Sequence, residues 1–91
     1  MSNKSSSWFV YFVRCADNSL YGGITTDLNR RVHEHNNDDK KGAKYTRPRR
    51  PVSLVYSESM PDKSSAAKRE YAVKKLSKKA KEALIIQDEK K

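Results

Sequence analysis

Four side chains suited to acid–base chemistry lie close together near the start of the sequence. They are Tyr11, Tyr21, Arg31 and His35, separated by ten, ten and four residues. Side chains four residues apart share one face of a helix, so Arg31 and His35 are expected to lie side by side. A guanidinium stabilises developing negative charge, and an imidazole exchanges protons near neutral pH. The set therefore suits a reaction in which a proton moves while negative charge grows.

Tyr11 is the favoured base, with His35 assisting. A free tyrosine has a pKa of about 10, so Tyr11 accepts a proton only if the positive charge of Arg31 or of a bound metal lowers that value. His35 titrates closer to neutrality and offers a second route, taking the proton directly or through Tyr11. The sequence leaves both routes open.

Glu70 is the only carboxylate between Asp62 and Glu82, in a segment rich in lysine. Mg²⁺ suits a single carboxylate, because it keeps most of its water ligands and binds one or two carboxylates together with substrate phosphate. A simpler interpretation is an ion pair with Lys74 one helical turn away, which would contribute only about 0.3 to 0.5 kcal/mol to stability.

The chain is predicted to begin with a β-hairpin, because aromatic and β-branched residues flank a turn signal. The two strands are residues 8–15 and 20–25. Pairing of Ala16 with Leu20 across a three-residue loop would put both tyrosines on one face of the sheet, whereas a two-residue loop would separate them. The sequence does not fix this register.

The later elements complete a small α/β domain of the α+β kind. They are a helix from Leu28 to about Asn36, a strand at residues 52–58 and a helical stretch that opens at Ser64 and Ser65. Side-chain oxygens in residues 25–27 are expected to cap the first helix. Ser77 is expected to divide the last helical stretch in two, since serine favours a helix cap over a helix interior.

Residues 36–51 are predicted to form a long basic loop, because they contain turn formers and cations but no apolar period. Five residues of the loop are predicted to bind nucleic acid: Lys44, Tyr45, Arg47, Arg49 and Arg50. Cations interleaved with an aromatic side chain suit phosphate contact and base stacking. The plain alternative is solvated charge without a partner.

The whole chain is strongly basic, with 20 Lys and Arg against 11 Asp and Glu, a net charge of +9 and a pI near 9.8. Polyanions, most commonly nucleic acid, are the partners that such a charge favours, although basic charge also serves solubility alone. At 91 residues the chain is expected to be a monomer with one domain. Its predicted parts are a disordered segment at 1–7, the domain at 8–86 and a frayed tail at 87–91.

Several classes are excluded by what the sequence lacks. It has no apolar run long enough for a signal peptide or a membrane span, so a cytoplasmic location is expected. Cys15 is the single cysteine, which excludes an internal disulfide and a cysteine-based zinc site and favours a packing role for this side chain.

The ordered set of motifs resembles the GIY-YIG nuclease domain family, and within it the small stand-alone bacterial branch of YhbQ-like proteins. Phe9-Val10-Tyr11 stands where the family has Gly-Ile-Tyr, and Tyr21-Gly22-Gly23 stands where it has Tyr-Ile-Gly. The stretches GITTDLNRRVHEH, GAKYTRPRRPVSLVYSE and KREYAVKKLSKKAKEALI resemble the following helix and the later segments. The resemblance covers residues 8–85. Gly22, which replaces a branched residue, is expected to loosen the second strand.

The resemblance implies a three-stranded antiparallel sheet flanked by helices, and a site that hydrolyses phosphodiesters. The positions that match the family's catalytic residues are Tyr11, Tyr21, Arg31, His35 and Glu70. Glu70 would hold one divalent metal, Mg²⁺ or Mn²⁺, and the substrate would be nucleic acid, with DNA favoured over RNA. Branched, nicked or single-stranded DNA would then be cut one strand at a time.

Two functions without catalysis remain as alternatives. The first is a nucleic-acid-binding module that uses the same basic face as a phosphate cradle. The second is an adaptor that binds an acidic protein through that face. Metal-dependent cleavage distinguishes the nuclease from both, and affinity for nucleic acid at moderate salt distinguishes the first alternative from the second.

Overall fold

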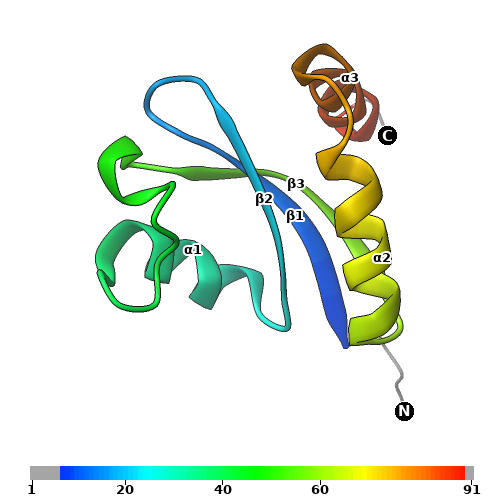
Figure 1. Cartoon of the computed structure of the whole chain (residues 1–91), viewed down its shortest axis with the longest axis horizontal. Helices are drawn as coiled ribbons and strands as arrows, with labels where there is room; N and C mark the ends of the chain where they lie inside the picture. The colour runs from blue at the N-terminus through cyan, green and yellow to red at the C-terminus, as the bar shows by residue number, and fades with distance from the viewer. Residues whose placement is uncertain (1–6, 90–91) are drawn as a thin grey trace.

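Three antiparallel strands and three helices make up residues 7–89, the part of the chain that the computed structural model describes (Figure 1). The strands are β1 (Trp8–Arg14), β2 (Leu20–Thr25) and β3 (Ser53–Met60). The helices are α1 (Leu28–Asn37), α2 (Lys63–Lys74) and α3 (Lys78–Glu89). Strand β1 lies at the centre of the sheet, in the order β2-β1-β3. The expected antiparallel sheet flanked by helices is confirmed.

The β1–β2 hairpin has a three-residue loop, but the register differs from the pairing considered in the sequence. Leu20 pairs with Arg14 and not with Ala16, the pairing considered from the sequence, which left the register open. The loop is residues 16–18, closed by the Cys15 N–H, which donates to the Ser19 carbonyl oxygen at 2.8 Å. The last loop residue, Asn18, has a φ of 70°. This is the left-handed conformation that asparagine tolerates and that this loop type requires. Both site tyrosines still share a face, because the register differs by two residues and side chains alternate.

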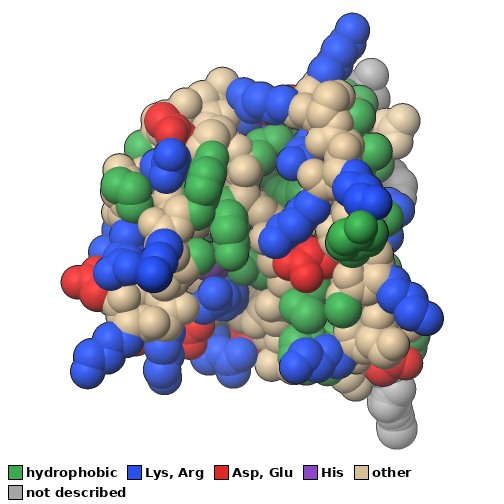
Figure 2. All heavy atoms as spheres, in the orientation of Figure 1, with side chains coloured by type: hydrophobic (Ala, Val, Ile, Leu, Met, Phe, Trp, Pro, Cys, Tyr) green, Lys and Arg blue, Asp and Glu red, His purple; other side chains and the backbone are tan. Residues whose placement is uncertain are grey.

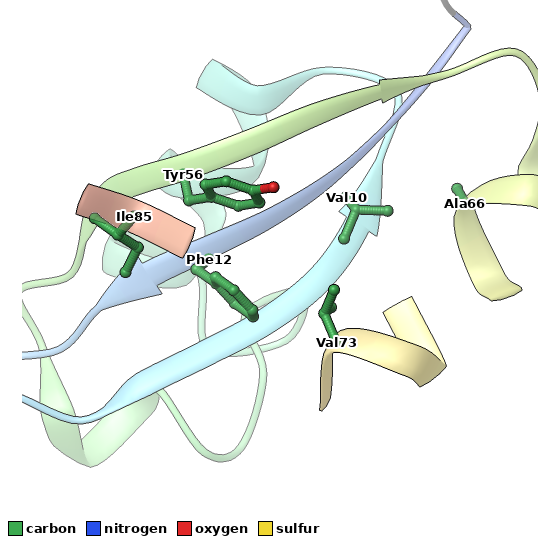
Figure 3. Packing of buried hydrophobic residues seen from close by; sticks show 6 residues of the cluster. All are labelled: Val10, Phe12, Tyr56, Ala66, Val73 and Ile85. Atoms are coloured by element: carbon green, nitrogen blue, oxygen red, sulfur yellow. The ribbon is translucent and has the colours of Figure 1, made fainter. Parts of the chain in front are cut away.

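Each face of the sheet packs against a separate small core. On one face the buried cluster comprises Val10, Phe12, Tyr56, Ala66, Val73 and Ile85, from the sheet, α2 and α3 (Figure 3). On the other face it comprises Tyr11, Val13, Cys15 and Val52, with Leu28 and Val32 of α1 packed against it. The packing role expected of Cys15 is confirmed, and β1 contributes to both cores.

Two glycines let aromatic rings of β1 lie across β2. Phe12 pairs directly with Gly22, and Tyr11 pairs directly with Gly23. A Cβ atom at Gly22 would lie 2.9 Å from Cε1 of Phe12, and one at Gly23 would lie 2.7 Å from Oη of Tyr11. Gly22 therefore makes room for a core ring, which the expectation of a merely loosened strand missed.

Aspartates, more than serines, set where the helices begin. The Asp27 side chain accepts a hydrogen bond from the Arg30 N–H at 3.0 Å and caps α1, as expected for residues 25–27. Helix α2 begins at Lys63 and is capped by Asp62, so the expected opening at Ser64 and Ser65 is wrong. Asp62, two residues before Ser64, offers a charged hydrogen-bond acceptor at a position where the backbone is still extended.

Ser77 separates α2 from α3, as predicted, and its hydroxyl accepts a hydrogen bond from the Ala80 N–H at 3.1 Å. Helix α3 continues to Glu89, into the segment 87–91 that was expected to fray. Residues 1–6 and 90–91 lie outside the described part, and the predicted domain limits stay predictions. No helix within residues 7–89 has the length and apolarity that a membrane span requires.

Candidate active site

Tyr11 and His35 form the buried centre of the candidate site. The Tyr11 ring extends across β2 toward α1, where its Oη lies 2.8 Å from Nε2 of His35. Only 1% of the Tyr11 surface and none of the His35 surface is exposed. Leu28 and Val32 pack α1 against the face of the sheet that carries Tyr11, and His35 lies on the same stripe of the helix, which explains why these two groups meet.

Tyr21 lies beside this pair and is partly exposed. Its ring contacts the His35 ring edge-on, with centroids 5.4 Å apart. The ring of Tyr45, from the loop, stacks on Tyr21 with centroids 5.6 Å apart. Lys74 of α2 holds its Nζ 5.5 Å from the Tyr21 ring centroid. Tyr21 thus links the groups of α1, the loop and α2.

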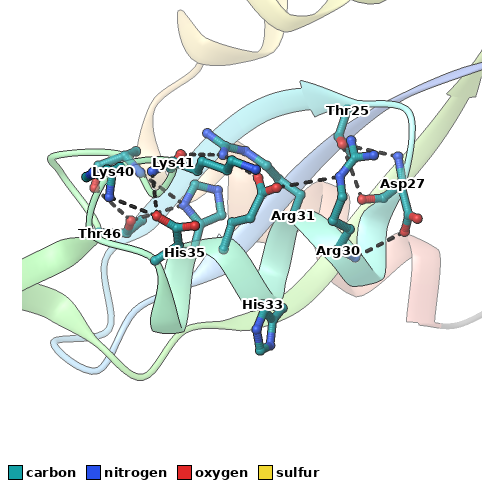
Figure 4. Close-up of polar contacts among 12 residues, drawn as sticks. Thr25, Asp27, Arg30, Arg31, His33, His35, Lys40, Lys41 and Thr46 are labelled. Carbon is teal, nitrogen blue, oxygen red and sulfur yellow. Dashed lines mark hydrogen bonds and ion pairs between the residues drawn. The ribbon is translucent and has the colours of Figure 1, made fainter.

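Arg31 lies one helical turn before His35, as the spacing predicted (Figure 4). Its Nη1 donates to Oε1 of Glu34 at 2.9 Å and to the Lys41 carbonyl oxygen at 2.6 Å, and its positive charge opposes the rise in the pKa of the Tyr11 phenol. These contacts fix a positive charge at the edge of the buried pair. His33 is exposed and points away from this group.

Glu70 approaches the site from α2, on the side of the hairpin opposite α1 (Figure 1). Its negative charge raises the pKa of Tyr11, which places the carboxylate within electrostatic reach of the phenol. Its Oε2 also lies 3.0 Å from Nζ of Lys74, so the ion pair considered from the sequence does form. Among residues 7–89 no three His, Cys, Asp or Glu side chains cluster, so Glu70 would have to bind a metal with at most one further side chain of these kinds.

Burial keeps both members of the central pair neutral at neutral pH. Desolvation raises the pKa of Tyr11 to about 12, and Tyr21 and Glu70 add to this, although Arg31 opposes it. Desolvation, with the positive charges of Arg31 and Arg50, lowers the pKa of His35 to about 4. The lowered phenol pKa that general-base action by Tyr11 required is therefore absent, and His35 is neutral but a weaker base than a solvated imidazole.

The buried imidazole predicts a loss of stability in mild acid. The unfolded chain takes up a proton at His35 near pH 6.5, and the folded chain takes it up only near pH 4. Proton uptake therefore stabilises the unfolded state relative to the folded state as the pH falls through this range. Between pH 7.5 and pH 5 the free energy of unfolding should fall by about 2 kcal/mol. Urea unfolding at pH 7.5 and at pH 5 measures this difference in the free energy of unfolding. His35→Gln should remove most of this difference; an equal fall in both proteins would contradict the prediction.

The predicted nucleic-acid-binding residues of the loop divide into two groups. Arg49 pairs with Asp17 at 3.0 Å and covers the Tyr45 ring, with its Cζ 4.0 Å from the centroid. Arg50 pairs with Asp39 at 2.9 Å and donates from Nε to the His35 carbonyl oxygen at 2.6 Å. Both arginines therefore hold the loop in place. The exposed cations Lys44 and Arg47 remain available to a partner.

Thr46 is a site residue that sequence reasoning missed. Its side chain is fully buried, and its Oγ1 lies 3.1 Å from Nδ1 of His35. The loop reaches the site because Gly42 packs directly on the end of α1, where a Cβ atom would lie 2.7 Å from the Glu34 carbonyl oxygen. The only sequence signal was a hydroxyl residue with a branched Cβ inside a basic loop.

The surface around the site is basic on both sides. Figure 2 shows Lys and Arg side chains gathered over α1 and its loop and again over α2, with apolar side chains between them. No enclosed pocket forms among the described residues, so the partly exposed groups lie on an open face. An open, basic face suits an extended polyanion better than a small molecule.

Comparison with known proteins agrees with this geometry. Residues 7–83 match the GIY-YIG catalytic domain. A UPF0213 protein of Desulfotalea psychrophila is 57% identical over 84 residues, which cover 92% of this chain and 76% of the relative. The solution NMR structure of a UPF0213 protein from Bacillus halodurans is 45% identical, with a TM-score of 0.56 over 88% of this chain and 83% of that one.

A second solution NMR structure, from E. faecalis, is 39% identical, with a TM-score of 0.61 over 99% of this chain and 92% of that one. Placement in the YhbQ-like branch stays a prediction. The Desulfotalea psychrophila and Bacillus halodurans relatives carry the UPF0213 name, and the E. faecalis structure carries no family name. The match to the catalytic domain extends over most of the chain, and the chain therefore belongs to the GIY-YIG family.

Proposed function

We propose that this chain is a metal-dependent endonuclease that hydrolyses phosphodiester bonds in nucleic acid, with DNA as the favoured substrate. The observation that carries the proposal is the meeting of a fixed cation, Arg31, with the buried Tyr11–His35 hydrogen bond. The carboxylate of Glu70 is within electrostatic reach of the same phenol. Membership of the GIY-YIG family supports the reaction class.

The donor set at Glu70 fits one hard divalent cation. Mg²⁺ needs one or two carboxylates, because water and substrate phosphate complete its ligands. Lys74 pairs with Glu70 at 3.0 Å, so a divalent cation would have to displace its ammonium group. When bound there, a divalent metal would supply electrophilic stabilisation of the phosphoryl oxygens and of the leaving oxygen.

In the proposed reaction, Tyr11 and His35 move the proton together. The attacking water gives a proton to Oη of Tyr11 while Tyr11 gives its own proton to Nε2 of His35, 2.8 Å away. Because the two transfers are concerted, no free phenolate has to form, which accommodates a phenol pKa raised to about 12. Arg31 neutralises the charge that grows on the phosphoryl oxygens as the bond to the leaving oxygen breaks.

Access to the phenol requires a small rearrangement. Tyr11 is 1% exposed, so water reaches its Oη only after neighbouring side chains move. The Tyr21–Tyr45 stack lies against His35, and the Tyr45 ring is 38% exposed. We expect nucleic acid to displace this stack when it binds, which would make cleavage depend on a bound substrate.

Lys44 and Arg47 are expected to contact the backbone of the nucleic acid. Each phosphate contact adds about one unit to the slope of log affinity against log salt. The double change Lys44→Ala and Arg47→Ala should therefore reduce that slope by about two, measured by fluorescence anisotropy at several salt concentrations. A control with the same loss of charge is Lys68→Ala with Lys79→Ala. An equal effect in both variants would show that net charge alone acts.

The proposal is tested by cleavage of branched, nicked and single-stranded DNA and of matched RNA, with Mg²⁺ or Mn²⁺ against chelator. Arg31→Ala should abolish most cleavage, whereas Arg30→Ala should not. The two arginines are neighbours on α1 and both pair with Glu34, but the Arg30 side chain is 54% exposed and faces solvent. An unchanged cleavage rate in the presence of chelator and in the Arg31→Ala variant would overturn the proposal.

A binding module without catalysis is the second candidate. The full burial of His35 and the Glu70–Lys74 ion pair favour it, because both groups are satisfied within the protein. Under this alternative no metal ion supports cleavage, yet DNA still binds in chelator. The same assay separates the two candidates, since only the nuclease loses a measurable rate on Arg31→Ala.

A further inference from the structure

A chain of buried hydrogen bonds runs from the Tyr11 phenol through His35 to the loop. Tyr11 Oη lies 2.8 Å from Nε2 of His35, and Nδ1 of the same ring lies 3.1 Å from Oγ1 of Thr46. The Thr46 hydroxyl in turn donates to the Ala43 carbonyl oxygen at 3.0 Å. Tyr11, His35 and Thr46 are each at most 1% exposed, so water does not substitute for any of these partners.

The direction of these hydrogen bonds determines which ring nitrogen of His35 carries the proton. A threonine hydroxyl has one proton, and in Thr46 it goes to Ala43, which leaves an oxygen lone pair facing Nδ1. Nδ1 then carries the hydrogen and donates to Thr46. Nε2 is left with its lone pair and accepts the proton of the Tyr11 hydroxyl.

The opposite tautomer leaves a buried proton without an acceptor. With hydrogen on Nε2, the ring would donate to Tyr11, and the phenol proton would need another partner. Among the described residues the phenol has no hydrogen-bond acceptor besides His35, and the nearby Arg31 guanidinium only donates. One contact favours this tautomer, the Ala43 N–H at 3.5 Å from Nδ1, but it lies at the long limit for a hydrogen bond. A buried phenol without an acceptor outweighs it.

We infer that Thr46 is a positioning residue, which holds neutral His35 in the tautomer with hydrogen on Nδ1 so that Nε2 receives the Tyr11 proton. The tautomer is a property of the folded protein alone. Its effect on cleavage rests on the proposed function. Thr46 touches neither water nor substrate, so it acts only through His35.

The decisive measurement is the nitrogen NMR spectrum of His35, because the two ring nitrogens shift in opposite directions when the tautomer changes. Wild type should show a protonated Nδ1 and an unprotonated Nε2 at pH 7. Thr46→Val keeps the branched shape without the hydroxyl and should shift His35 toward the other tautomer or a mixture. Thr46→Ser keeps the hydroxyl and should restore the wild-type pattern.

A matched control is Thr25→Val, which removes another buried hydroxyl, one that bonds only to Asp27. It should leave the His35 spectrum unchanged. An Nε2-protonated ring in wild type, or an unchanged tautomer in a folded Thr46→Val protein, would overturn the inference. If Thr46→Val fails to fold, the wild-type spectrum still decides the tautomer, and Thr46→Ala, which also lacks the hydroxyl, tests the need for a hydroxyl.

Cleavage supplies the second readout. Thr46→Val should lower kcat by about ten- to a hundredfold with little change in KM, and Thr46→Ser should recover most of the rate. An unchanged kcat in a variant whose tautomer has shifted would overturn the catalytic part of the inference. If no form of the protein cleaves, the proposed function fails, and the spectra still test the tautomer independently.

Discussion

Glu70→Gln is expected to reduce metal-dependent cleavage about a thousandfold while leaving affinity for nucleic acid nearly unchanged. The amide keeps the size of the side chain but carries no charge, so a divalent cation loses the carboxylate that is proposed to hold it. Lys74 is also freed from its 3.0 Å ion pair and adds positive charge where the metal would bind. Both changes lower the affinity of the site for the metal, and neither removes a residue predicted to bind phosphate.

Single-turnover cleavage at saturating DNA measures this loss, and anisotropy in chelator measures the binding. Glu82→Gln is the matched control, because Glu82 forms an ion pair of 2.6 Å with Arg14 in another part of the fold. That variant should cleave at nearly the wild-type rate. Full cleavage by Glu70→Gln would remove Glu70 from the proposed metal site and leave the single-metal mechanism without a ligand.

Gly23→Ala is expected to destabilise the fold by about 1 to 3 kcal/mol and to abolish cleavage. The new Cβ would lie 2.7 Å from Oη and 3.0 Å from Cζ of Tyr11, so the ring has to shift. The ring lies in a core with only a few members, and its hydroxyl would then leave Nε2 of His35. Urea unfolding measures the stability, and the shift in midpoint reports it directly.

Tyr11→Phe combined with Gly23→Ala tests the cause of this loss. Removal of the hydroxyl takes away the shortest contact, so the double variant should be more stable than the sum of the two single changes predicts. Strict additivity would indicate that the clash is relieved elsewhere. A Gly23→Ala protein with wild-type stability would contradict the close approach itself.

The elements were predictable where local chemistry alone decides them. The aromatic and β-branched residues of β1, the capping aspartate of α1 and the serine between α2 and α3 are all signals within a few residues. Asp62 displaced Ser64 as a cap because two neighbouring residues offered similar oxygens, and the sequence does not rank them. The hairpin register was open for the same reason, since two three-residue loops fit one turn signal.

The identity of the site residues was more predictable than their state. Tyr11 and His35 meet as expected, but the direction of their pKa shifts depends on how completely later elements bury them. Thr46 gave no periodic signal, because a loop places its side chains by packing and not by spacing. Arg49 and Arg50 were predicted to be free cations for the same reason. Their acidic partners lie 32 and 11 residues away in the sequence, and only the folded loop brings them together.

The chain order of the site groups bears on the protein's biosynthesis. Tyr11 belongs to the first strand, whereas Glu70 belongs to α2, which follows all three strands. A nascent chain whose hairpin and α1 have left the ribosome already carries two tyrosines, the arginine and the histidine, but not the carboxylate. The proposed nuclease would thus stay inert toward messenger RNA and nearby nucleic acid until α2 has been synthesised and has docked.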